Sequence, residues 1–127
     1  MHTLLKLAAV AAMGVVIGAA GMRIGRAQST PHAFIIAEVQ VNDTAAYRPY
    51  LQQTTPIVTK YGGHYIVRAG KTVSFEGSPP SPRVAVIEFP SLAALQQFES
   101  SPEYRKVAEI RHKAATSRIF GVEGVVP

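Results

Sequence analysis

The sequence predicts an α+β domain in which an antiparallel sheet carries helices on one face. Three observations predict it. Several short runs have the length and apolar pattern of strands, capping residues and glycines mark helix ends between them, and the order is strand, helix, strand, strand, helix pair, strand. The 127 residues are enough for one such domain.

The first segment, residues 1–27, has the pattern of an export signal. Lys6 makes its start positive, residues 7–22 are apolar throughout, and Gly25-Arg26-Ala27 offers small residues to a signal peptidase. The alternative is an uncleaved membrane anchor, but at about 1.5 Å per residue the apolar stretch spans roughly 24 Å, short of the ~30 Å hydrocarbon core. We expect cleavage, a leader over residues 28–33, and a periplasmic or secreted protein. It would meet a membrane only if the segment is retained.

The first strand is predicted over residues 33–41, where Ile35, Ala37, Val39 and Val41 share one face. Asn42-Asp43-Thr44 then supplies turn and capping chemistry for a helix that ends at Gly62-Gly63. Pro49 and Pro56 interrupt this helix. Because a proline removes a backbone hydrogen bond, we expect a kink or a helix that begins near Pro49.

The remaining elements follow from similar local signals. A second strand is predicted over 64–69, a short strand over 72–76 before a proline-rich turn, and a third strand over 83–89. Pro90 stops the third strand, and serines cap two successive helices that begin near Leu92 and Pro102. The last strand is predicted over 117–126.

This order is the split βαβ pattern of a ferredoxin-like α+β sandwich, βαββαβ. Its helices cover one face of the sheet and leave the other open. By strand alternation, the open face would carry Phe34, Ile36, Ile66, Val84, Val86, Phe120 and Val122. Such a patch is too large for a soluble monomer. We therefore expect two sheets to pack face to face in a homodimer.

Several classes of function are disfavoured. The chain has no cysteine, and no zinc spacing, phosphate loop, nucleophile elbow or dinucleotide fingerprint is present. The four histidines are scattered, so we expect no cofactor and no metal. After residue 27, ten Lys and Arg residues are interleaved with eight Asp and Glu residues, which argues against a nucleic-acid partner.

Five runs resemble the domain-of-unknown-function 1330 family: VNDTAAYRPY, YGGHYIVRAG, FEG at 75–77, PRVAVIEFPSLAALQQFESSPEYRKVAEIRHKAA and GVEGV. The resemblance covers residues 34–125 and implies a dimeric α/β barrel, in which two ferredoxin-like sheets face each other. Relatives in that superfamily include cofactor-independent monooxygenases, haem-degrading enzymes, muconolactone isomerase-like enzymes and binding modules. The family has no established activity, so the resemblance implies a fold and not a reaction. The chain departs from the family at Phe98, where tryptophan is usual, and at Glu99-Ser100, where an aromatic-acid pair is usual.

The first candidate site lies on the open sheet face, where alternation places Glu38, His64, Arg68 and Glu88. An antiparallel register would set His64 opposite Glu88 or Arg68 opposite Val84. A histidine beside a carboxylate is able to act as a general acid or base near neutral pH. The alternative is a buried ion pair that only orders the dimer interface.

The second candidate is the helix stripe that holds Tyr104 and Arg111, seven residues apart on one face. Arg111 would offer its guanidinium to a carboxylate, either of a ligand or of Glu76. The alternative is that Arg111 simply ties the Glu76 hairpin to the helix. The helically spaced Tyr47, Tyr50 and Tyr61 are interpreted as core.

Two functional hypotheses follow. In the first, an exported homodimer binds a small anionic or aromatic molecule, with or without catalysis as a cofactor-independent oxygenase, isomerase or lyase. His64 with Glu88 would then move a proton, Arg68 and Arg111 would stabilise an anion, and Tyr104 would orient the ligand. In the second, the protein is a non-catalytic dimerisation or stress-related module in which the same side chains are structural.

Overall fold

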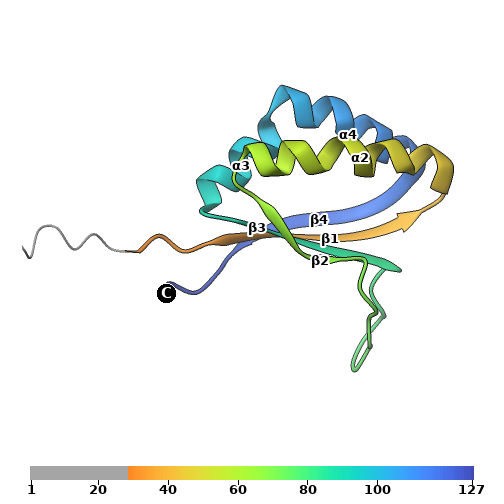
Figure 1. Cartoon of the computed structure of the whole chain (residues 1–127). Helices are drawn as coiled ribbons and strands as arrows, with labels where there is room; N and C mark the ends of the chain where they lie inside the picture. Colours follow the sequence, from red (N-terminus) through yellow and green to blue (C-terminus); the bar gives the residue numbers. More distant parts are fainter. Residues whose placement is uncertain (1–28) are drawn as a thin grey trace, which may run out of the picture.

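The structure, a computed structural model, describes residues 29–127. In chain order its elements are β1 (Ala33–Val41), α2 (Thr44–Lys60), β2 (His64–Arg68), β3 (Arg83–Phe89), α3 (Leu92–Ser100), α4 (Pro102–Ala114) and β4 (Ala115–Glu123). The three helices lie on one side of the sheet and leave its other side open (Figure 1). The predicted ferredoxin-like α+β architecture is therefore confirmed.

The sheet has the strand order β2-β3-β1-β4, and each neighbouring pair is antiparallel. The alternation predicted for β1 is observed: Ile35, Ala37 and Val39 are buried under the helices, while Phe34 and Ile36 point to the open face and are half-buried. The predicted helix-capping residues are also confirmed. The side chain of Asp43 accepts from the Ala46 amide, and those of Ser91 and Ser101 start α3 and α4 in the same way.

The first helix differs from its prediction. α2 runs without interruption from Thr44 to Lys60 although Pro49 and Pro56 lie within it, so the expected start near Pro49 is wrong. Each proline leaves the carbonyl four residues earlier without its helical donor. Those carbonyls belong to Ala45 and Gln52, which are both exposed, so water is available to satisfy them.

The predicted short strand over 72–76 is also absent. Residues 69–82 have no strand and form a loop that projects from the sheet on the side away from the helices (Figure 1). The chain leaves β2 at Ala69, whose φ of 56° lies in the left-handed region, and Gly77 turns it back with a φ of 73°. Ala69 N still donates to the Val84 carbonyl of β3 at 2.8 Å, and residues 70–82 then continue without strand structure.

A β-bulge in β2 changes the face of one predicted site residue. His64 pairs with Glu88 and Tyr65 with Ile87, but the next pairs are Val67 with Val86 and Arg68 with Ala85. The extra residue, Ile66, reverses the alternation after it. The prediction that Arg68 faces away from the helices is therefore wrong.

Arg68 instead contacts the helix side of the sheet. Its Nη2 donates a hydrogen bond to Thr55 Oγ1 of α2 at 3.0 Å, and its guanidinium lies 4.5 Å from the ring centroid of Tyr65. Val67 takes its place on the open face. The predicted pairing of Arg68 with Val84 is replaced by pairing with Ala85.

The core between sheet and helices is closed by aromatic rings. The ring of Phe98 in α3 lies 5.3 Å from that of Phe89 and 4.3 Å from that of Tyr104, centroid to centroid. All three side chains are buried.

Within residues 29–127, no helix is both long enough and apolar enough to cross a bilayer. The predicted export signal lies outside the described residues.

Candidate functional site

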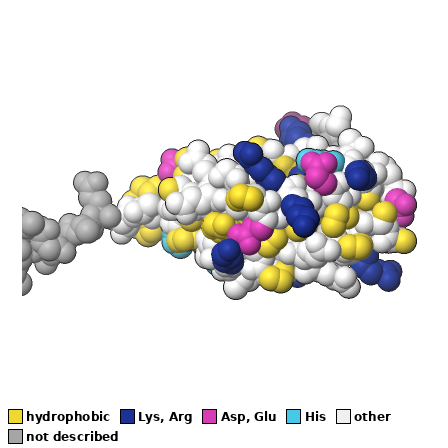
Figure 2. Space-filling view, turned by 90° about the horizontal axis from the view of Figure 1, so that it is seen from above, with side chains coloured by type: hydrophobic (Ala, Val, Ile, Leu, Met, Phe, Trp, Pro, Cys, Tyr) yellow, Lys and Arg dark blue, Asp and Glu magenta, His cyan; other side chains and the backbone are white. Residues whose placement is uncertain are grey.

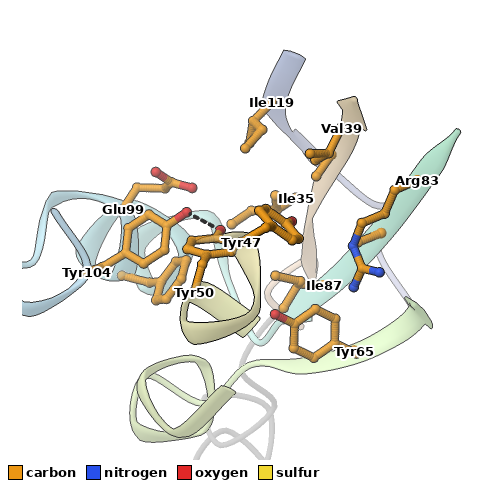
Figure 3. A pocket seen from close by; sticks show the side chains of 13 residues that line it. Ile35, Val39, Tyr47, Tyr50, Tyr65, Arg83, Ile87, Glu99, Tyr104 and Ile119 are labelled. Atoms are coloured by element: carbon orange, nitrogen blue, oxygen red, sulfur yellow. Dashed lines mark hydrogen bonds between the residues drawn. The ribbon is translucent and has the colours of Figure 1, made fainter. Parts of the chain in front are cut away.

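A small cavity lies inside the domain between the sheet and the helices (Figure 3). Its volume of about 30 Å³ is enough for roughly two water molecules, at ~10–15 Å³ for each. Its walls include Tyr47 and Tyr50 from α2, Tyr65 from β2 and Tyr104 from α4. Three different elements therefore contribute phenol rings to its lining, beside aliphatic side chains of the sheet.

Two of these tyrosines form a hydrogen bond with each other. The hydroxyl oxygens of Tyr50 and Tyr104 are 2.9 Å apart, and the ring of Tyr47 lies 5.3 Å from that of Tyr50. Burial raises the pKa of Tyr104, and Tyr50 adds to this effect, so the hydroxyl keeps its proton. Tyr104 faces inward as predicted. Tyr47 and Tyr50 belong to the core, as expected, and also line the cavity.

Arg111 lies next to this tyrosine pair. Its side chain is 8% exposed, its guanidinium carbon is 5.6 Å from the Tyr50 ring centroid, and its Nη1 donates to Ser117 Oγ. Its Nε is buried and has no hydrogen-bond partner. A buried guanidinium N–H without an acceptor is uncommon and requires an explanation.

Of the two partners predicted for Arg111, a ligand carboxylate or Glu76, the second is wrong. Glu76 is exposed in the loop over 69–82, which leaves the sheet on the side opposite to α4 (Figure 1). The sheet therefore separates the two side chains. The sequence placed both in one domain but did not reveal on which side the loop emerges.

The acid beside Arg111 is Glu99 of α3, which the sequence reasoning did not select. Glu99 borders the tyrosine cavity and two further hollows of about 270 and 240 Å³, and Arg111 borders both of these hollows. Burial raises the pKa of Glu99, while Arg111 acts in the opposite direction. A helical spacing of four from Leu95, whose side chain is buried, is the signal that would have placed Glu99 inward.

Arg83 was also missed and lies at the other end of the cavity. Its guanidinium is 5.9 Å from the ring centroid of Tyr47. Figure 3 shows Arg83 and Tyr65 on one side of the cavity and Glu99 with Tyr104 on the other. Burial raises the pKa of Tyr65, so this hydroxyl also stays protonated. The cavity thus has the Arg83 guanidinium at one end and the Glu99 carboxylate at the other.

The open-face candidate is divided into two separate pairs. His64 does stand opposite Glu88, as predicted, with Nε2 and Oε2 3.9 Å apart. A closer partner was missed, because His32 Nδ1 lies 2.7 Å from Glu88 Oε1. The His64 side chain is 64% exposed, so within one chain no pocket encloses this group.

Glu38 lies toward the other end of β1. Arg118 donates to its Oε2 from Nη2 at 2.8 Å and from Nε at 3.1 Å. Glu38 is therefore on the predicted face, but its charge is held by an arginine of β4 and it does not join His64. Within residues 29–127, no group of three or more histidine or acidic side chains is arranged to hold a metal ion.

The outer surface of the helices carries charges of both signs. In Figure 2, which views this surface from above, Lys and Arg side chains are interspersed with Asp and Glu side chains, without a continuous basic stripe. One histidine on this side, His112, lies 3.4 Å from Glu109 within α4. This face therefore has no concentrated charge that would select a polyanion.

Comparison with known proteins supports the fold. A protein of unknown function from Rhodopseudomonas palustris matches with a TM-score of 0.62 and 20% identity, covering 85% of this chain and 92% of that chain. SnoaB, a cofactor-independent oxygenase from Streptomyces nogalater, matches with a TM-score of 0.56 and 12% identity, covering 76% and 95%. At these identities the similarity concerns the fold alone.

No curated protein matches the chain. The match to a family is more extensive, since residues 32–125 fit the family described as a domain of unknown function, DUF1330. This range contains every strand and helix of the described residues, from β1 to β4. The chain therefore belongs to the DUF1330 family, whose name states a domain and not an activity.

Proposed function

We propose that the protein binds a small organic acid or enolisable carbonyl compound in the hollow of about 270 Å³ that Glu99 and Arg111 line. The observation that carries this proposal is the buried Arg111 Nε, which has no acceptor and stands beside hollows that Glu99 also borders. A ligand oxygen with negative charge would supply the missing acceptor. The ligand occupies the hollow of about 270 Å³, because the tyrosine cavity holds only water-sized groups.

The arrangement suits proton transfer. Glu99, with its raised pKa, accepts a proton from a weakly acidic C–H or O–H bond, and the electron pair of that bond moves onto the substrate oxygen. Arg111 stabilises that oxyanion. Tyr104 borders the hollow of about 240 Å³ and not this one, so it is assigned no contact with the substrate. Return of the proton to another atom gives isomerisation. Addition of the substrate carbanion to O₂ as co-substrate would form a C–O bond and a peroxide anion, which takes the proton from Glu99 to give a hydroperoxide; this is oxygenation, the class named for SnoaB.

Glu99 thereby takes the role that the sequence suggested for His64. His64 is a weaker choice because it is exposed and lies on the opposite face from the cavity. Arg68 and Glu76 also lie away from Arg111, so the anion-binding role rests on Arg111.

Deuterium exchange tests the proposal. Acetylacetone is a small enolisable probe, and its C–H exchange in D₂O is followed by NMR with and without the protein. Glu99→Gln should lower the protein-dependent rate by about 10²-fold or more, the usual contribution of a general base. Glu123→Gln is the matched control, since Glu123 is an exposed glutamate at the end of β4 that lines none of these hollows. Equal rates for both variants would exclude Glu99 as the base.

Anion binding is tested separately with benzoate. Titration followed by NMR should place the shift changes around Arg111, and Arg111→Met should weaken benzoate binding at least tenfold. The alternative function is a non-catalytic module. The tyrosine cavity favours it, because a volume of about 30 Å³ is too small for an organic substrate. Under that alternative, Glu99→Gln changes thermal stability but alters neither exchange nor benzoate binding.

We further propose that two copies associate through their open sheet faces. Ile66 is 49%, Phe120 44% and Val122 47% exposed, and other apolar side chains of this face are half-buried in the single chain. An apolar area of this kind favours association. Light scattering of the protein should give the dimer mass. Val122→Glu should shift it toward the monomer, whereas Val126→Glu, an exposed valine outside β4, should not.

Export is proposed on the pattern of residues 1–27. Intact-mass analysis of the protein from a periplasmic fraction should show a chain that begins near residue 28. The full-length mass in a membrane fraction would support the anchor instead.

A further inference from the structure

The loop over residues 69–82, here called the arm, exposes a large aromatic side chain at its tip. Phe75 is 93% exposed and Val73 is 66% exposed. Figure 1 shows the arm extending away from the sheet on its open side. A phenyl ring in water on a projecting loop gains apolar contact only from another surface.

A hollow of about 470 Å³ lies on the same open side of the sheet. Ile36, Val84 and Phe120 supply its apolar walls, and the ion pair of Glu38 with Arg118 lies at its edge. The root of the arm, including Val73 and Pro80, forms a further wall, but the tip residues Phe75 and Glu76 do not line it. The hollow is therefore bordered by its own arm and not filled by it.

We infer that Phe75 of one copy inserts into this hollow of a second copy, so that the two arms are exchanged across the dimer. The inference rests on the proposed homodimer and names the contact that it makes. A two-fold axis would place both arms equivalently, since a closed dimer uses the same patch on each copy. The hollow has room for the ring, because an apolar cavity of about 150 Å³ already holds benzene.

Charge complementarity points to the same occupant. Glu76 follows Phe75 at the tip, and Arg118 at the edge of the hollow has a side chain that is 75% exposed. Arg118 donates to Glu38 through Nε and Nη2. Because a guanidinium has five N–H donors, some remain for a second carboxylate. Seating Phe75 of one copy would bring its Glu76 toward this guanidinium of the other.

The contact would also reach the ligand site. Phe120 borders both the open-face hollow and the hollow shared by Glu99 and Arg111. A ring packed against Phe120 from the second copy would restrict its movement and thereby define the wall of the ligand hollow. Dimer formation and ligand binding would then be coupled through one side chain.

Disulfide trapping tests the inference directly, because the chain has no cysteine of its own. Two full-length chains with tags of different size are co-expressed, one carrying Phe75→Cys and the other Ile36→Cys. Oxidation should join them in a band of the summed mass on a non-reducing gel. The matched control replaces Phe75→Cys with Val125→Cys, since Val125 is also 93% exposed but lies outside the arm. This control pair should not be joined.

A second measurement requires no cross-link. Phe75→Ala should raise the dimer dissociation constant at least tenfold in sedimentation equilibrium, and Val125→Ala should leave it unchanged. Neither side chain is buried, so both variants are expected to fold. Glu76→Arg should also weaken the dimer, and Arg118→Glu in the same chain should restore part of the loss.

The outcomes separate the two proposals. A wild-type chain that is monomeric overturns the homodimer and this inference with it. A wild-type dimer that gives no Phe75→Cys to Ile36→Cys bridge, and whose dissociation constant is unchanged by Phe75→Ala, overturns the exchange of arms alone. A bridge formed only within one chain carrying both cysteines would show that the arm folds onto its own sheet, which also overturns it.

Discussion

The hydroxyl oxygens of Tyr50 and Tyr104 lie 2.9 Å apart, in a buried hydrogen bond that joins α2 to α4. Tyr104→Phe removes one partner and leaves the Tyr50 hydroxyl facing a cavity with room for about two waters. We expect the free energy of unfolding to fall by about 1 kcal/mol. Urea denaturation measures the change.

The double variant distinguishes a hydrogen bond from simple loss of packing. If the two hydroxyls bond, Tyr50→Phe with Tyr104→Phe should lose clearly less than the sum of the single losses, because the second change removes a group already without its partner. Additive losses within about 0.3–0.5 kcal/mol would contradict the coupling.

Gly63 leaves no room for a side chain next to Phe89. A Cβ at this position would lie 2.7 Å and 2.8 Å from ring atoms of Phe89, a fully buried side chain. Gly63→Ala should therefore destabilise the fold by about 1–3 kcal/mol. Gly70→Ala is the matched control, since nothing lies within 4 Å of its Cβ position, and it should be neutral or stabilise by about 0.4–1 kcal/mol. Thermal unfolding of both variants checks the contrast.

Glu103 should make stability depend on acid pH. Lys60 Nζ and the Tyr61 hydroxyl each donate to its Oε1 at 2.8 Å, and these hydrogen bonds lower the pKa of Glu103. A carboxylate whose pKa is lower in the folded state stabilises the fold above its unfolded pKa, about 4.3, and loses that contribution as pH falls through the folded pKa. The Tm difference between wild type and Glu103→Gln should therefore be largest at neutral pH and shrink toward acid pH.

Salt supplies the control for this prediction. Both charged side chains are substantially exposed, so 1 M NaCl should reduce the difference at neutral pH. Lys60→Met should remove part of the same pH dependence. Parallel Tm curves for wild type and Glu103→Gln across the acid range would contradict the assignment.

The bulge at Ile66 is tested by two adjacent residues. Val67 faces the open side opposite Val86, whereas Arg68 faces α2. Val67→Glu should therefore weaken the proposed dimer at least tenfold in sedimentation equilibrium. Arg68→Glu should leave the dimer unchanged and reduce only thermal stability. The reverse result would mean that strand alternation continues unbroken through β2.

Local signals were sufficient for the order of the elements. The caps at Asp43, Ser91 and Ser101 and the glycines after α2 act over three or four residues, so they are visible in a single sequence. The continuity of α2 through Pro49 is not visible in this way. It depends on which carbonyls face water, and that is known only once the helix has packed.

The candidate site was harder to predict than the fold. The bulge adds one residue to an edge strand and has no compositional mark, so Arg68 was assigned to the wrong face. The spacing of Glu99 from Leu95 could have placed Glu99 inward, but its approach to Arg111 depends on how the two helices joined at Ser101 pack against each other. Tyr104 was placed correctly, because it lies on the buried stripe of its own helix.

The same bulge bears on how the sheet resists aggregation. β2 and β4 are the two edges, and an edge strand offers unpaired backbone groups to foreign strands. β2 has five residues, an interrupted ladder and a left-handed turn at Ala69, so an incoming strand finds little regular edge. β4 has nine residues, and Phe120 and Val122 on it are exposed. Strand addition leading to fibrils should therefore begin along β4, because the regular pairing of this edge strand is not interrupted by a bulge.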